Sequence, residues 1–307
     1  METISIIGNH KNKSLAEYVA QIVFTVCALV AVLAVAAITI YMITGGVPAL
    51  FEVGLKEILF GTLWAPAAKD AHFGILYVIL TSITGTMAAV LLGVPIALLT
   101  AVFLAEVAPA GLAKVVRPAV ELLAGIPSVI YGLLGILILN PLMYKLEKIV
   151  FAGSDTHQYT GGSNLLSAVI VLAIMILPTV INISESALRA VPDHLKSASL
   201  ALGASKIETI FKVVIPAAKS GIISGIVLGV GRAIGEAMAI TLVSGSSVNA
   251  PLPFNSVRFL TTAIVSEMGY AEGLHRKVLF TIGLVLFVFI MAINLILTRI
   301  LKEKEEK

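Results

Sequence analysis

Long apolar segments alternate with short polar segments along most of this chain. A helix of about 20 apolar residues crosses a hydrocarbon core about 30 Å thick. We expect spanning helices at residues 18–43, 73–105, 118–143, 165–187, 220–243 and 278–300. The pattern therefore predicts an all-α membrane protein with six transmembrane helices.

The first apolar segment is too long for the core of a signal peptide, and no small-residue cleavage site follows it in the usual place. We expect it to remain as a membrane anchor, followed by a connection that contains Gly45, Gly46 and Pro48. On this basis the chain divides into residues 1–71, an N-terminal helix with its connection, and residues 72–301, the main membrane domain.

Three of the expected spans contain a proline. A proline in a helix interior removes one backbone hydrogen bond and clashes with the preceding turn, so Pro95, Pro127 and Pro178 predict helix kinks. Kinks occur around polar pathways, where neighbouring groups satisfy the freed backbone, and also where they serve packing alone. The sequence leaves both interpretations open.

Composition agrees with lipid as the solvent. Apolar residues make up 58% of the 307 positions, charged residues 13%, and the mean hydropathy is +1.03. A water-soluble domain carries roughly twice that charged share. Lysine and arginine lie in the gaps between apolar segments, which argues against nucleic-acid binding. The five histidines show no ligand spacing, so no metal site is expected.

The basic residues of the loops predict the orientation of the chain. Short loops on the cytoplasmic side of a membrane carry an excess of lysine and arginine. With six spans both termini share a side, and that side holds thirteen such residues against seven on the other. We therefore expect both termini to be cytoplasmic.

The segment between the fourth and fifth expected spans is longer than a helix connection needs. Asp193 suits a helix start, and Gly203 can supply the left-handed residue that ends this helix. Ser205 followed by Glu208 has the spacing of a capping box, which would start a second helix. Residues 190–218 therefore predict two short helices that meet at a glycine corner.

This segment resembles the cytoplasmic signature loop of ABC-importer permeases, which opens with glutamate-alanine-alanine and closes with an aliphatic-x-aliphatic-proline. The matching residues here are Ser197, Ala198, Ser199, Gly203, Val213, Ile215 and Pro216. Serine replaces the usual glutamate and the second alanine, which keeps the residues small but removes a glutamate contact. The resemblance implies a coupling helix that docks on an ATPase subunit. The residues implied in coupling are Ser197, Ala198, Ser199, Leu202, Gly203 and Ala204.

Two charged residues lie inside the fifth expected span. Arg232 and Glu236 are the only charged residues in the range 220–257. Arg232 would lie roughly 18 Å into the hydrocarbon core, where an unpaired arginine costs about 2.5–3.5 kcal/mol. Glu236 would lie one helical turn further on and on the same face, so we expect the two side chains to pair.

This pair has two interpretations. It is either a structural ion pair that locks the bundle, or a site where Arg232 holds an anion in transit. In the second case Glu236 orients the guanidinium and keeps the anion from binding too tightly to leave. The planar fork of arginine suits two oxygens of a phosphate. We favour the second interpretation because ionisable residues inside membranes are usually functional.

The surroundings of Arg232, together with FLAEVAP at Phe103–Pro109 and ELLAGIPSVIYGLLG at Glu121–Gly135, resemble the PstC-type permease of phosphate-specific ABC importers. The resemblance covers most of the chain from Phe73 onward. It implies a type I ABC-importer permease fold with a cytoplasmic coupling helix, a place in the bacterial cell inner membrane, and inorganic phosphate as the cargo.

The resemblance also implies that Arg232 and Glu236 form part of the substrate translocation path. Ser128 and Tyr131 lie in the third expected span, which we expect to be kinked at Pro127. Their hydroxyls could line the same path, or they could serve helix–helix packing. Both roles remain open for these two residues.

Partners follow from the same resemblance. It implies a second homologous permease (PstA-like), two copies of a cytoplasmic ATPase (PstB-like), a periplasmic phosphate-binding protein (PstS-like) and membrane lipid. The sequence has no glycine-rich phosphate loop with its lysine and serine. We therefore expect no enzymatic activity and no cofactor in this chain, with ATP used by the partner subunit.

Other functions compete with this one. The nearest are the sister permease of the same importer and a permease for another oxyanion, such as sulfate or molybdate. An ATP-independent secondary transporter or channel belongs to a different class and needs no docking loop. An intramembrane enzyme would need several convergent polar side chains at membrane depth, where only Arg232 and Glu236 are available.

Three glutamates lie near expected span ends on the cytoplasmic side. We expect Glu106, Glu121 and Glu185 to stabilise the edges of the membrane domain. Glu185 lies four residues before Arg189, which is a favourable spacing for an ion pair on a helix.

Overall fold

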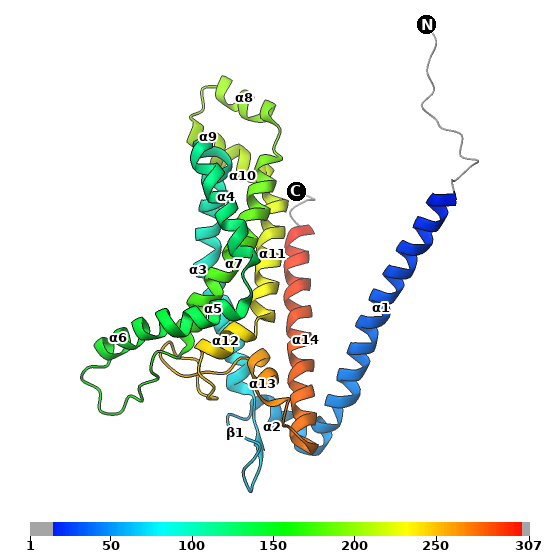
Figure 1. Cartoon of the computed structure of the whole chain (residues 1–307), viewed down its shortest axis with the longest axis vertical. Helices are drawn as coiled ribbons and strands as arrows, with labels where there is room; N and C mark the ends of the chain where they lie inside the picture. The colour runs from blue at the N-terminus through cyan, green and yellow to red at the C-terminus, as the bar shows by residue number, and fades with distance from the viewer. Residues whose placement is uncertain (1–14, 303–307) are drawn as a thin grey trace.

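The computed structural model describes residues 15–302, and helices dominate it (Figure 1). Five helices are long and apolar enough to cross a membrane: Glu17–Phe60, Leu76–Val107, Ser128–Val150, Leu165–Arg189 and Gly273–Ile296. A sixth span is present if the bent pair Lys206–Ala217 and Lys219–Gly235 is counted as one. This confirms the all-α membrane architecture. Lys11, Lys13, Lys304 and Lys307, which entered the count of loop charges, lie outside the described residues.

The N-terminal helix is longer than the sequence predicted. Helix α1 (Leu15–Ala49) runs through a π-helical turn, η1 (Leu50–Gly54), into α2 (Leu55–Phe60). Most of α1 diverges from the rest of the molecule (Figure 1), and its side chains are largely exposed. The expected connection at residues 45–48 was therefore wrong, because this stretch is the last part of α1.

Two glycines let the end of α1 pack closely against another helix. A Cβ on Gly45 would lie 2.9 Å from the ring of Phe280, and one on Gly46 would lie 2.9 Å from the Phe280 backbone. Phe280 belongs to α14 (Gly273–Lys302), so the missing side chains let α1 and α14 touch. The Thr281 hydroxyl donates to the Gly46 carbonyl at 2.8 Å and fixes this contact.

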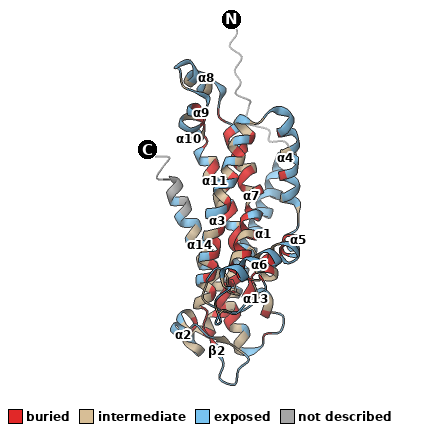
Figure 2. Ribbon diagram, turned by 90° about the vertical axis from the view of Figure 1, so that its left-hand side faces the viewer, coloured by how far each residue is buried: buried red, intermediate tan, exposed pale blue. Residues whose placement is uncertain are grey.

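The centre of the bundle is a pair of unbroken helices. Helix α3 (Leu76–Val102), extended by the π-helical turn η2 (Phe103–Val107), packs against α7 (Leu165–Arg189). Buried residues concentrate on these helices (Figure 2). Pro95 and Pro178 lie inside them, and neither proline interrupts its helix. Both helices therefore continue through their prolines.

The third expected span is broken rather than kinked. Helix α4 (Ala110–Gly125) ends before Ile126 and Pro127, both of which have extended backbone. Proline disfavours a helical conformation in the residue before it, which accounts for the break. The chain then forms α5 (Ser128–Leu134), the π-helical turn η3 and α6. Their bounds are Gly135–Leu139 for η3 and Asn140–Val150 for α6.

The fifth expected span is also broken. Helix α11 (Lys219–Gly235) ends before Glu236, whose backbone is extended at φ −73° and ψ 132°. A second helix, α12 (Met238–Val243), follows after Ala237. The prediction of one continuous helix over residues 220–243 was therefore wrong.

The segment before α11 has the two-helix form that the sequence predicted. Helix α8 (Asp193–Ala201) lies at one end of the molecule (Figure 1). Helix α9, the π-helical turn η4 and helix α10 follow it and bend by 70° into α11. The bounds are Lys206–Thr209 for α9, Ile210–Val214 for η4 and Ile215–Ala217 for α10.

The opposite end of the molecule holds the other connections. Strand β1 (Trp64–Ala65) pairs antiparallel with β2 (His72–Phe73), and α13 (Leu260–Glu267) lies nearby (Figure 1). The buried carboxylate of Glu267 accepts hydrogen bonds from Trp64 Nε1 at 3.2 Å and from Arg258. It also lies 2.7 Å from His275 Nε2. These contacts tie the N-terminal hairpin to α13 and α14.

Candidate functional site

The two helix breaks lie beside each other. A Cβ on Gly132 of α5 would lie 2.9 Å from Ala239 Cα of α12, and one on Gly135, the first residue of η3, would clash with Val243 Cγ1. The two short helices therefore run in parallel at close range. Ser128 and Tyr131 both lie on α5, and α12 begins two residues after Glu236. The structure thus places the helix that carries Ser128 and Tyr131 against the helix that follows Arg232 and Glu236.

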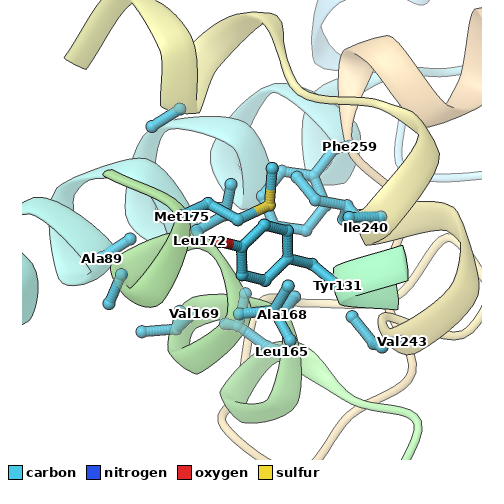
Figure 3. Close-up of a cluster of buried hydrophobic side chains, with 14 of the residues drawn as sticks. Ala89, Tyr131, Leu165, Ala168, Val169, Leu172, Met175, Ile240, Val243 and Phe259 are labelled. Carbon is cyan, nitrogen blue, oxygen red and sulfur yellow. The ribbon is translucent and has the colours of Figure 1, made fainter. Parts of the chain in front are cut away.

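Tyr131 anchors the first break. Its ring is 8% exposed and points into the central hydrophobic cluster, toward Met175 and Leu172 (Figure 3). Its hydroxyl donates to the Leu123 carbonyl, in the last turn of α4, at 2.7 Å. The last carbonyls of a helix have no partner within the helix. Tyr131 therefore closes the end of α4 as well as filling the core.

Arg232 lies in the last turn of α11 and is half-buried. Within residues 15–302, no ion pair and no side-chain hydrogen bond involves its guanidinium. The charge therefore lies among apolar helices without a carboxylate bound to it.

Glu236 does not pair with Arg232, which corrects the prediction from spacing. The spacing argument assumed a continuous helix, but α11 has already ended at this residue. The Glu236 carboxylate instead accepts a hydrogen bond from the Ala239 backbone N–H, at 3.0 Å, in the first turn of α12. Its own carbonyl accepts from the Thr261 hydroxyl at 2.7 Å. Glu236 thus holds the second break in place.

The glycines around Arg232 differ in their surroundings. A Cβ on Gly229 would lie 2.7 Å from Val180 of α7, so this glycine permits close helix packing. A Cβ on Gly231 or Gly235 would meet nothing within 4 Å. The chain therefore leaves open space on the face of α11 next to Arg232.

The corner between α8 and α9 has the glycine conformation and the capping box that the sequence predicted. Gly203 adopts φ +90°, a conformation that favours glycine. Ser205 Oγ accepts from the Glu208 backbone N–H at 3.2 Å, and the Glu208 carboxylate accepts from the Ser205 backbone N–H at 3.0 Å. The Ser199 and Thr209 hydroxyls, 2.9 Å apart, join the two short helices. Ser199 thus has a contact that alanine could not make.

The residues predicted to couple to a partner project from this end of the molecule. Ser197, Ala198 and Gly203 are exposed, and Ala204 is half-buried. Leu202 is 90% exposed, which is exceptional for a leucine outside the lipid-facing helices. An exposed apolar side chain at a rigid corner is typical of an interaction surface. This group lies well apart from the breaks near Arg232 (Figure 1).

At the same end, the sequence did not reveal that Arg117 and Lys196 bind distant glutamates. Arg117 Nε donates to Glu185 at 2.5 Å, and Arg189 Nε donates to the same oxygen at 2.9 Å. The second contact confirms the spacing argument for Glu185. Lys196 Nζ donates to Glu106 at 2.7 Å. Sequence separations of 68 and 90 residues give no local signal, so only the fold could show these pairs.

Residues 93–304 match the family model described as "Binding-protein-dependent transport system inner membrane component". Among curated proteins, the chain is 36% identical over 303 residues to a probable ABC transporter permease protein, YqgH, of Bacillus subtilis, covering 96% of this chain and 95% of that protein. It is 33% identical to the phosphate transport system permease protein PstC of Xylella fastidiosa, covering 96% of this chain and 93% of that one. The PstC protein of Haemophilus influenzae is also 33% identical, with 91% of each chain covered.

Solved structures agree on the fold. A chain of a bacterial alginate ABC transporter, in complex with an alginate pentasaccharide-bound periplasmic protein, matches with a TM-score of 0.61 at 18% identity. The match covers 92% of this chain and 95% of that one. A chain of the inward-facing MetNI methionine ABC transporter matches with a TM-score of 0.57 at 19% identity, covering 75% and 95%.

Proposed function

The chain belongs to the family of binding-protein-dependent transport system inner membrane components, and from this premise we propose that it carries inorganic phosphate as the PstC-type permease of a bacterial ABC importer. It is a multi-pass permease subunit of the inner membrane. The observation that supports phosphate as the cargo is the sequence identity of 33% to phosphate transport permeases over more than nine tenths of this chain.

The geometry around Arg232 supports an anion as the cargo. A guanidinium at membrane depth without a carboxylate partner costs about 2.5–3.5 kcal/mol or more. An anion that enters beside Gly231 and Gly235 would offset that cost while it is bound, through two parallel hydrogen bonds to the guanidinium. Because the Glu236 carboxylate already accepts a hydrogen bond from the first turn of α12, its role is to hold the break open rather than to neutralise the charge of Arg232.

The other end supports the partners of the proposed importer. The exposed corner at Leu202 and Gly203 would dock on one of two ATPase subunits (PstB-like), which bind and hydrolyse ATP outside this chain. A PstA-like permease would complete the pathway on the open face of α11. A PstS-like binding protein would deliver phosphate at the end that carries β1 and α13. This assignment makes the end with α8 cytoplasmic.

Phosphate uptake by the assembled importer tests this proposal. In the complex reconstituted in proteoliposomes, Arg232→Ala should lower phosphate uptake by about 10- to 100-fold, because charge-assisted hydrogen bonds contribute about 1.5–3 kcal/mol. The matched control is Arg276→Ala, which removes an exposed arginine at the opposite end. Normal uptake by an assembled Arg232→Ala complex would refute the role of this residue.

The same vesicles separate phosphate from other oxyanions. The wild-type complex, loaded with the binding protein, should accumulate phosphate and exclude sulfate and molybdate. Uptake of sulfate or molybdate in place of phosphate would favour the alternative of a permease for another oxyanion.

A further inference from the structure

A polar contact links the coupling end to the central helices. Lys196, on the face of α8 turned toward the bundle, donates to Glu106 of η2 at 2.7 Å. The side chain of Glu106 is 10% exposed and that of Lys196 is 22% exposed. Surface ion pairs contribute little because water screens them, whereas a pair shielded to this degree is screened far less. This contact therefore joins α8 firmly to the end of α3.

The next contacts connect that end of α3 to α4. Arg117 of α4 donates from Nη2 to the Leu104 carbonyl of η2 at 3.1 Å and from Nε to Glu185 of α7 at 2.5 Å. The side chain of Glu185 is 8% exposed. Ala113 and Val120, on the same face of α4, are also buried. One face of α4 is thus fastened to both central helices.

The far end of α4 is joined to α5. Its last turn offers the Leu123 carbonyl to the Tyr131 hydroxyl, and α5, which carries Tyr131, packs against α12 beyond the second break. A series of contacts therefore runs from Lys196 through Glu106 and η2 to α4, and from the end of α4 through Tyr131 to α5, which packs against α12. Coupling between distant sites travels through contiguous networks of this kind when an element has two arrangements.

We propose that α4 is the strut that carries movement of α8 to the break beside Arg232, with Lys196 and Glu106 as the positioning residues that engage it. This inference rests on the proposed function, because it requires an ATPase that moves α8. A displacement of α8 would pull on η2 through the ion pair and shift α4 along its packed face. The Tyr131 hydroxyl would then move the start of α5, which flanks Arg232.

Charge reversal of the Lys196–Glu106 ion pair tests whether movement of α8 reaches α4 through this contact. In the reconstituted complex with its ATPase and binding protein, Lys196→Glu and Glu106→Lys should each lower phosphate uptake per ATP hydrolysed by about 2- to 30-fold, the range found for residues in coupling networks. The double reversal restores the pair in the opposite sense and should return most of the lost coupling. The amount of ATPase bound to the complex should not change.

The control is another Lys–Glu ion pair, more exposed to solvent, at the opposite end. Lys277 of α14 bonds to Glu52 of η1, with side chains 42% and 45% exposed. Lys277→Glu with Glu52→Lys should leave uptake per ATP unchanged, both singly and together. The milder variants Lys196→Met and Glu106→Gln carry the same expectation if either reversal prevents assembly.

The proposal is overturned if the single variants keep wild-type uptake per ATP, or if the double reversal stays as low as the singles. Failure of the proposed cargo gives a different result, since the wild-type complex would then take up no phosphate. In that case the fraction of ATPase activity that depends on the binding protein replaces uptake as the measure of coupling. The single variants should lower that fraction, and the double reversal should restore it.

Discussion

Two regions of this molecule respond differently to the same kind of residue. In the central pair, α7 continues through Pro178 without a break, and α3 continues through Pro95. In the first broken span, α4 continues through Pro118 but ends before Pro127. Pro178 is buried, whereas Pro95 and Pro127 are both exposed, so burial of the proline alone does not decide whether its helix continues.

The difference shows how the molecule separates rigidity from movement. Side chains that satisfy freed backbone groups stabilise the two breaks: Tyr131 bonds to the Leu123 carbonyl, and Glu236 bonds to the Ala239 N–H. Each break is therefore held by a side-chain hydrogen bond together with packing in the central cluster, which includes Tyr131 and Ala239. A transporter needs a fixed frame and elements that shift against it. We assign the first role to α3 and α7 and the second to the broken helices.

A valine in place of Gly93 should break the rigid pair and have the largest effect. A Cβ at this position would lie 2.8 Å from Ile176 Cδ1 and 3.0 Å from the Ala173 carbonyl oxygen. Overpacking of a tight contact costs about 1–3 kcal/mol, so the purified chain should unfold at a clearly lower temperature in detergent. The control is Gly111→Val in α4, where a Cβ meets nothing within 4 Å. An equal loss in both variants would contradict the assignment of α3 and α7 as the frame.

Phenylalanine in place of Tyr131 tests the hydrogen bond that stabilises the break between α4 and α5. The ring stays in the core, and only the hydrogen bond to Leu123 is lost, which costs about 1 kcal/mol. We expect uptake per ATP to fall in the reconstituted complex, with a smaller loss of stability than for Gly93→Val. Unchanged uptake would mean that the ring serves packing alone.

Tyr159→Phe is the matched control for that experiment. The Tyr159 hydroxyl also donates to a carbonyl eight residues before it, that of Phe151, at 3.3 Å. It lies on an exposed loop away from the breaks, so its loss should leave uptake per ATP at the wild-type level.

Much of the frame could be predicted from the sequence, because apolar length alone locates α3, α7 and α14. The glycine corner at Gly203 was predictable for a similar reason, since capping residues act over three or four positions. The pairing of Arg232 with Glu236 was not, because the spacing rule holds only while the helix continues. The partner of Glu106 lies 90 residues away, beyond any local rule.

The corner between α8 and α9 offers the smallest test. Ser205→Ala removes an N-cap hydroxyl, which costs about 1 kcal/mol, so amide hydrogens of α9 should exchange about fivefold faster. Ser224→Ala is the control, because its hydroxyl bonds to the Ser220 carbonyl within α11 and caps nothing. Unchanged exchange in α9 would show that the docked contacts, rather than the cap, hold this corner.

Acid should act on the same cap through Glu208. Hydrogen bonds from the Ser205 backbone N–H and hydroxyl, together with Lys212, lower the pKa of its carboxyl below the usual 4.5. A carboxylate with a depressed folded-state pKa stabilises the fold above its unfolded pKa and loses this contribution as the pH falls through the folded value. Protection of α9 should therefore decline below about pH 4 in the wild type, and Glu208→Gln should remove this pH dependence. Since the Glu208 side chain is half-exposed, the change should stay within the corner and leave the exchange of α3 and α7 untouched, which is the behaviour expected if the frame and this corner are stabilised independently.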